Sequence, residues 1–103
     1  MDLRFPDNFL FGSATSSFQV EGHPYAKGAQ PSIWNTFCRK KFAVKNGQNG
    51  TIACNHFELW ENDLAIIRDL NLDSYRFSVA WSRVLPTGEG QPNEKVLISM
   101  TSW

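Results

Sequence analysis

Hydrophobic positions along the chain fall into three blocks that predict a strand, a helix and a second strand. Residues 9–14 are apolar and then small, without polar alternation, which is typical of a strand buried on both faces of a parallel sheet. From residue 57 onward, apolar side chains recur at helical spacing and predict a helix with one apolar stripe. Residues 74–80 are rich in aromatic and β-branched residues and predict the second strand. The stripe consists of Phe57, Trp60, Leu64, Ile67 and Leu70.

Polar residues mark the limits and the outer face of this helix. Asn55 is the predicted N-cap, Glu58 completes a variant of the capping box, and Asn71 is the predicted C-terminal stop. Polar side chains lie largely off the apolar stripe, so we expect them to face solvent. They are Glu58, Glu61, Asn62, Arg68 and Asp69.

The connection between the first strand and the helix is long and has short helices of its own. Residues 16–21 predict a helical turn, Pro31 begins another short helix, and residues 39–54 predict a loop. The order strand, helix, strand predicts a βαβ unit with a parallel strand pair and a right-handed crossover. A closed barrel and an open doubly wound sheet both begin this way. The connection lacks a Gly-x-Gly-x-x-Gly fingerprint and is long enough to build a substrate pocket, which favours an α/β barrel.

Composition narrows the classes of partner and compartment. The chain has 103 residues, with 10 Lys and Arg against 10 Asp and Glu, so its formal net charge is zero. This balance argues against nucleic acid or an anionic membrane surface as a partner. Neither a signal-peptide pattern nor a membrane-spanning apolar run is seen, so we expect a cytoplasmic setting in which Cys38 and Cys54 are reduced. We expect no metal site and no cofactor, because no ligand pattern surrounds these cysteines.

Several motifs in one order resemble the glycoside hydrolase family one signature. They occupy residues 9–22, 31–37, 60–64, 75–86 and 93–95. The resemblance implies a (β/α)8 TIM barrel, of which residues 1–95 would form the first two βα units and leave the barrel incomplete. It also implies a retaining β-glycosidase, similar to β-glucosidases, whose full-length parent would act on a β-glycoside or small saccharide. Oligomeric state and sugar preference stay open.

Two residues receive roles from this resemblance. Gln19 matches the family glutamine that binds hydroxyls of the non-reducing sugar, and its amide offers both donors and an acceptor. Its alternative role is a buried amide that tethers a loop. Arg76 matches the family arginine beside the nucleophilic glutamate, where a guanidinium keeps a carboxylate ionised and oriented. Its alternative role is a structural ion pair.

Other polar and aromatic residues are weaker candidates. Glu21 belongs to the structural signature of the family and not to its catalytic pair. The acidic residues of the predicted helix, Asp63 included, are expected on a solvated face. Trp34 and Trp81 are expected to pack as apolar side chains. His23 and His56 have no partner at a recognisable catalytic spacing.

The catalytic carboxylates of the family are not recognisable in this chain. Retaining hydrolysis needs two carboxyl groups about 5–5.5 Å apart. In the family these lie in a Thr-x-Asn-Glu-Pro-type and a later Glu-Asn-Gly-type motif, and neither occurs in the sequence. We therefore expect the chain to be inactive alone. A sugar-binding module and a subunit that completes a split barrel are the alternatives.

Residues 96–103 depart from the family abruptly. After Asn93-Glu94-Lys95 the family typically continues Gly-Leu-Asp-Phe-Tyr-Asp-Lys-Leu-Val, whereas this chain continues Val-Leu-Ile-Ser-Met-Thr-Ser-Trp. Deleting one G from a possible coding sequence of the family segment yields this tail, followed by the first two bases of a TGA stop codon. The hypothesis is a one-base frameshift at the start of an aberrant tail.

Overall fold

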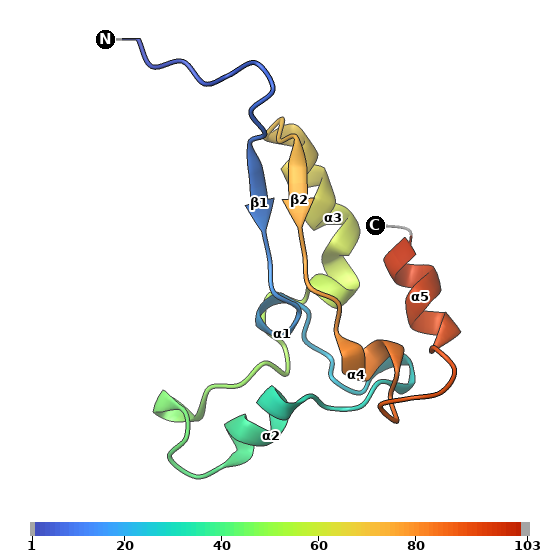
Figure 1. Cartoon of the computed structure of the whole chain (residues 1–103). Coiled ribbons are helices and arrows are strands. Elements are labelled where there is room, and N and C mark those ends of the chain that lie inside the picture. Colours follow the sequence, from blue (N-terminus) through green and yellow to red (C-terminus); the bar gives the residue numbers. More distant parts are fainter. Residues whose placement is uncertain (1, 102–103) are drawn as a thin grey trace.

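A computed structural model describes the backbone of residues 2–101 and the side chains of residues 2–97. Its helices and strands follow one another along an elongated molecule (Figure 1). In chain order they are β1 (Gly12–Ala14), α1 (Ser17–Val20), the 3-10 helix η1 (Ala26–Gly28), α2 (Ile33–Arg39), the 3-10 helix η2 (Lys45–Gly47), α3 (His56–Asp69), β2 (Ser74–Arg76), α4 (Trp81–Val84) and α5 (Glu94–Thr101).

The two strands form a parallel pair, as the βαβ prediction requires. Gly12 lies opposite Ser74 and Ala14 lies opposite Arg76. Both strands are shorter than the predicted runs of residues 9–14 and 74–80. A strand extends only as far as its neighbour provides backbone partners, and within the described chain each strand has one neighbour.

Helix α3 confirms the predicted position of the long helix and its polarity except at Leu70, which is 65% exposed after the helix end, and it does not confirm the predicted capping. Glu58 and Glu61 are exposed, and Asn71 adopts a left-handed conformation with φ 57° at the end of the helix. Asn55 also has a left-handed φ of 56°, and its side chain does not cap the helix. The predicted capping box at Asn55 and Glu58 is therefore wrong, because Asn55 Oδ1 instead hydrogen-bonds with His23 Nε2 at 2.6 Å.

A capping box is found instead at the start of α2. The Ser32 hydroxyl accepts a hydrogen bond from the Trp34 backbone N–H at 3.2 Å, and Asn35 Oδ1 accepts one from the Ser32 backbone N–H at 2.8 Å. These bonds satisfy backbone donors that a helix start otherwise leaves unpaired. They explain why α2 begins at Ile33, directly after Ser32.

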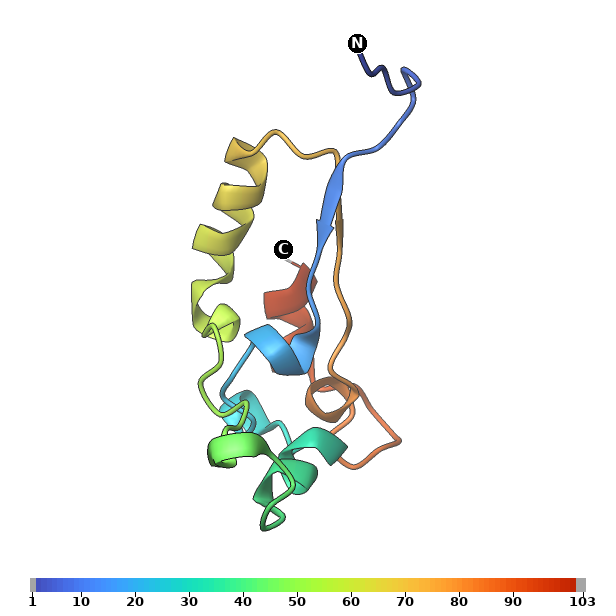
Figure 2. The same ribbon diagram turned by 90° about the vertical axis from the view of Figure 1, so that its left-hand side faces the viewer.

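The molecule is open and has a very small apolar core. Among residues 2–97, Ala29 and Val96 are the buried apolar residues, whereas Glu21, His56 and Arg83 are buried polar ones. The accessible surface of 8040 Å² exceeds by about a third the ~5,900 Å² expected of a compact monomer of 11.7 kDa. The radius of gyration of 16.7 Å exceeds the expected ~13 Å. Figure 2 shows α3 on one side of the β1–β2 pair, with no helix beside the strands on the opposite side in the described chain.

Candidate functional site

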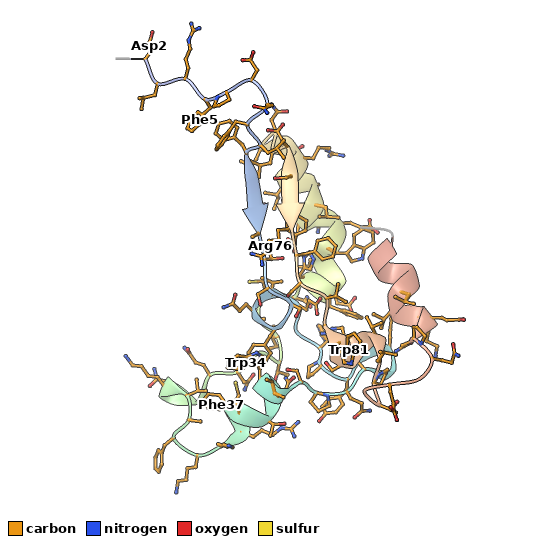
Figure 3. All side chains as sticks on the ribbon, in the orientation of Figure 1. Asp2, Phe5, Trp34, Phe37, Arg76 and Trp81 are labelled. Atoms are coloured by element: carbon orange, nitrogen blue, oxygen red, sulfur yellow. The ribbon has the colours of Figure 1, made fainter. Side chains whose placement is uncertain are left out.

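The C-terminal ends of the two strands lie together and bring the two predicted site residues to one edge of the sheet. Arg76 is the last residue of β2, and Gln19 lies on α1, which follows β1 closely. The Thr15 backbone N–H donates to the Arg76 carbonyl at 3.0 Å, and the Ser17 N–H donates to Ser78 Oγ at 2.8 Å. Figure 3 shows Arg76 at this end of the strand pair. Both segments are therefore held side by side.

Gln19 and Arg76 are both exposed. Neither side chain forms a hydrogen bond or an ion pair with another side chain of residues 2–97. Backbone bonds from Gln19 N–H and Val20 N–H to the Ser16 carbonyl, at 3.0 and 3.2 Å, hold α1 as one short turn. The two side chains are thus open to solvent at the end of the sheet where parallel αβ proteins place their ligand-binding groups.

Beside this edge lies a buried ion pair that the sequence motifs did not predict. Glu21 Oε2 accepts from Arg83 Nε at 2.8 Å, and the two residues are 2% and 6% exposed. The Arg83 guanidinium also donates to the carbonyls of Gly22 and His23, the latter at 2.8 Å. It lies 4.5 Å from the centre of the Phe57 ring. One guanidinium therefore holds three consecutive residues directly after α1.

Burial controls the protonation of Glu21. Loss of solvent raises the pKa of its carboxyl, while the hydrogen bond from Arg83, the charge of Arg83 and that of His56 act in the opposite direction. Glu21 and Arg83 are 62 residues apart, so no local sequence spacing predicts their ion pair. Glu21 and Arg83 both lie within motifs of the family signature, and this was the one sequence feature that could have indicated their pairing.

The histidines are not isolated, and Asp63 is not a simple solvated carboxylate. The buried His56 contacts Asp63 through Nδ1 and Oδ2 at 2.7 Å. Asp63 is half-buried, so the expectation of a solvated face is wrong at this position. His56 and Asp63 are separated by seven positions, about 10 Å along a regular helix, so helical spacing did not predict their contact; the backbone between them is non-helical at Leu59.

The tryptophans line a cavity next to the ion pair. Trp34 and Trp81 are 53% and 63% exposed, so the expected apolar packing is incomplete in this chain. They border a cavity of about 540 Å³ that also contacts Glu21 and Arg83, but not Gln19. Figure 3 shows Trp34 on α2 and Trp81 on α4. The cavity and the Gln19–Arg76 edge are therefore neighbouring but different surfaces.

Comparison with known proteins decides the family. The sequence profile of glycosyl hydrolase family 1 matches residues 1–98. The chain belongs to glycosyl hydrolase family 1. A β-glucosidase of Agrobacterium is 51% identical over 94 residues, which cover 91% of this chain and 20% of that enzyme. β-Glucosidase A of Thermotoga maritima is 49% identical over 94 residues, covering 91% of this chain and 21% of the enzyme.

Solved structures of this glycosidase family have the same shape over nearly the whole chain. The Thermotoga maritima β-glucosidase in complex with castanospermine superposes with a TM-score of 0.92 at 47% identity. The match covers 95% of this chain and 22% of that protein, so the chain spans about a fifth of the length of its relatives. The predicted family is confirmed. The chain is a small α/β fragment that resembles part of a family 1 TIM barrel.

The described part of the chain contains neither a membrane-spanning helix nor a cluster of metal-binding side chains. None of the helices within residues 2–101 combines the length and apolar character that crossing a membrane demands. The same part of the chain contains no cluster of three or more His, Cys, Asp or Glu side chains suited to a metal ion.

Proposed function

We propose that this chain forms the first two βα units of a retaining β-glycosidase barrel and supplies one wall of its sugar site. The observation that carries the proposal is the parallel β1–β2 pair, whose C-terminal edge presents Arg76 and the α1 turn together. Barrel enzymes place catalytic and binding groups at this edge. The substrate class is a β-glycoside or a small saccharide, and the cytoplasm is the proposed compartment.

Gln19 is the proposed sugar-binding residue. Its side-chain amide can donate to one hydroxyl and accept from the next, which suits neighbouring sugar hydroxyls. Its exposure leaves this amide available, in contrast to a buried loop tether. The Thermotoga maritima relative has been solved with deoxynojirimycin and with glucoimidazole. These ligands belong to that protein and support a sugar-like ligand at the matching edge of this one.

Arg76 is the proposed partner of the nucleophilic carboxylate. A guanidinium beside a carboxylate lowers the carboxyl pKa and fixes its orientation through paired hydrogen bonds. The residues described here offer Arg76 no ion-pair partner, which agrees with a carboxylate supplied from elsewhere in the barrel. Since two carboxyl groups about 5–5.5 Å apart are needed, we propose that the chain alone does not hydrolyse glycosides.

A chimera tests this function. Residues 1–95 of this chain would replace the matching segment of Thermotoga maritima β-glucosidase A, and hydrolysis of an aryl β-glucoside would be measured. We expect activity. Gln19→Ala should lower kcat/KM by about ten- to a hundredfold, since it removes hydrogen bonds to the sugar. Arg76→Ala should lower it on the order of a hundredfold, as loss of a preorganised donor does.

Matched controls separate these roles from general damage. Gln91→Ala and Arg68→Ala change exposed residues of the same types and should leave kcat/KM unchanged. A chimera that folds but does not hydrolyse glucosides contradicts the proposed function. Equal activity of the Gln19→Ala variant and its Gln91→Ala control removes Gln19 from the site.

A sugar-binding module is the second candidate, and the exposed Trp34 and Trp81 favour it. Indole rings bordering a cavity of about 540 Å³ could stack on sugar rings. Calorimetric titration of the chain with glucose and cellobiose distinguishes the two candidates. Saturable binding would support the module, and its absence would support the incomplete barrel.

The aberrant-tail hypothesis stays a proposal. The family profile ends at residue 98, shortly after the proposed boundary at residue 96. Val96 is fully buried at the start of the tail, while the side chains of residues 98–103 lie outside the described part of the structure. Sequencing the downstream DNA tests the idea, which fails if the restored frame does not encode further barrel strands.

A further inference from the structure

Helix α1, which carries Gln19, is not capped by its own N-cap residue. The N-cap Ser16 has an extended backbone, with φ −120° and ψ 132°, and its side chain makes no capping hydrogen bond. The first backbone N–H groups of a helix have no partner within the helix, and an N-cap serine ordinarily supplies one. One of these donors is bound from outside instead, because Ser17 N–H donates to Ser78 Oγ at 2.8 Å. A hydroxyl 61 residues away in sequence therefore satisfies the start of α1.

Ser78 lies where the ladder of the parallel strands would continue. Ala14 is opposite Arg76, and the Thr15 N–H donates to the Arg76 carbonyl at 3.0 Å. A parallel ladder repeats every two residues, so the next donor is Ser17 and its regular acceptor would be the carbonyl of Ser78. The Ser78 hydroxyl accepts this bond in place of the carbonyl. It thus continues the register of the strands while the backbone after β1 turns into α1.

The other end of α1 is also fixed. Glu21 N–H donates to the Ser17 carbonyl at 2.9 Å, and the Glu21 side chain is the buried partner of Arg83. Ser78 and Arg83 both belong to the segment that runs from β2 into α4 (Figure 1). One segment therefore binds both ends of the short turn that carries Gln19.

The position of the Gln19 amide depends on the backbone of α1, because the side chain is exposed and is not fixed by packing. Loss of the Ser78 hydroxyl would release the first residue of α1 while Glu21 stays anchored, and the amide would shift relative to Arg76. We propose that Ser78 is a positioning residue for glycoside hydrolysis, whose hydroxyl sets the placement of Gln19 relative to Arg76. Small displacements of a substrate-binding group reduce rates strongly. This inference rests on the sugar-binding role proposed for Gln19.

Kinetics of the chimera that contains residues 1–95 test this role. Ser78→Ala should lower kcat/KM for an aryl β-glucoside by about three- to tenfold, since it removes one hydrogen bond that orients a binding group. Ser78→Thr retains the hydroxyl and should keep the activity of the unaltered chimera. Ser16→Ala is the matched control, because it removes a neighbouring hydroxyl that caps nothing, and it should keep this activity as well. Equal kcat/KM of the Ser78→Ala and Ser16→Ala variants overturns the proposal.

A double-mutant cycle distinguishes positioning from general damage. If Ser78 acts through Gln19, Ser78→Ala should have little further effect on kcat/KM once Gln19 has been replaced by alanine. Independent effects would multiply instead. Full multiplication of the two losses overturns the proposal, because a merely structural role of Ser78 does not depend on the Gln19 side chain.

Hydrogen exchange gives a readout that does not depend on activity. In the folded chimera, Ser78→Ala should speed exchange of the Ser17 amide by about three- to tenfold, as measured by mass spectrometry on a peptide of residues 15–21. Ser78→Thr and Ser16→Ala should leave this rate unchanged. An unchanged rate in Ser78→Ala overturns the contact on which the inference rests.

The outcomes for Ser78 and for the glycosidase function are distinguishable. A folded chimera that does not hydrolyse the glucoside contradicts the glycosidase function, and with it the role of Ser78 in that reaction. Hydrolysis by the chimera that Ser78→Ala leaves unchanged retains the glycosidase function and contradicts the role of Ser78 alone.

Discussion

Glu21 and Arg83 form a buried ion pair, with 2.8 Å between Glu21 Oε2 and Arg83 Nε, across 62 residues of sequence. The same guanidinium binds the carbonyls of Gly22 and His23 and lies against the Phe57 ring. Arg83 thus connects the segment after β2 with the segment after β1 and with α3. This contact fixes the backbone next to α1, where Gln19 lies.

The first prediction concerns loss of Arg83. Arg83→Met should destabilise the chimera by about 3–5 kcal/mol, because it leaves the Glu21 carboxylate buried without its partner. Urea unfolding of the chimera measures the change. Arg68→Met is the control: its ion pair with Asp69 is exposed, so we expect a change below about 1 kcal/mol. Equal effects of the two substitutions would show that the buried pair has no special role.

The second prediction concerns pH. Burial raises the pKa of Glu21 above its ordinary 4.5, so the folded state binds this proton more tightly than the unfolded state does. The stability that Glu21 contributes through this difference is fully present below pH 4.5 and is lost as pH rises through the folded-state pKa. Glu21→Gln cannot titrate, and its stability relative to the unaltered chimera should therefore improve as pH rises.

Urea unfolding at a series of pH values measures this trend. Gln91→Ala changes an exposed side chain that does not titrate and should keep a constant offset from the unaltered chimera over the same range. A difference between Glu21→Gln and the unaltered protein that stays constant, or changes in the opposite direction, contradicts the prediction.

The third prediction separates steric conflict from backbone strain at two glycines. Gly22 has φ 71°, and a Cβ added there would clash with the Ile52 carbonyl oxygen. Gly47 has a similar φ of 64°, with nothing within 4 Å of its added Cβ. Gly47→Ala should cost about 1–2 kcal/mol from the left-handed conformation alone. Gly22→Ala should cost clearly more in the same unfolding measurement, and equal costs would refute a steric role for Ile52.

The fourth prediction concerns the chain without a partner. Its large exposed apolar side chains include Leu10 at 67%, Val79 at 55% and Trp81 at 63% exposure. Exposed strand edges and apolar patches promote association, so we expect the isolated chain to bind a hydrophobic dye and to aggregate. Sharp, dispersed NMR signals from the isolated chain would contradict this expectation.

The sequence by itself determined the local elements and the family. The apolar stripe predicted α3, the β-rich run predicted β2, and the ordered motifs predicted the family that the profile match confirms. These features are local, because periodicity and short motifs are read within one stretch of chain. The strand ends and the cap at Asn55 were predicted less well, since both depend on partners distant in sequence.

Only the tertiary structure decided which distant side chains meet. No spacing rule connects Glu21 with Arg83, and the residue-type preference of Asn55 for capping was overridden by its contact with His23. Tertiary structure also showed that Gln19 and Arg76 belong to one edge and that Trp34 and Trp81 border a different surface. The physical reason is that parallel pairing of β1 with β2 brings together segments separated by a long crossover, and sequence periodicity does not specify that juxtaposition.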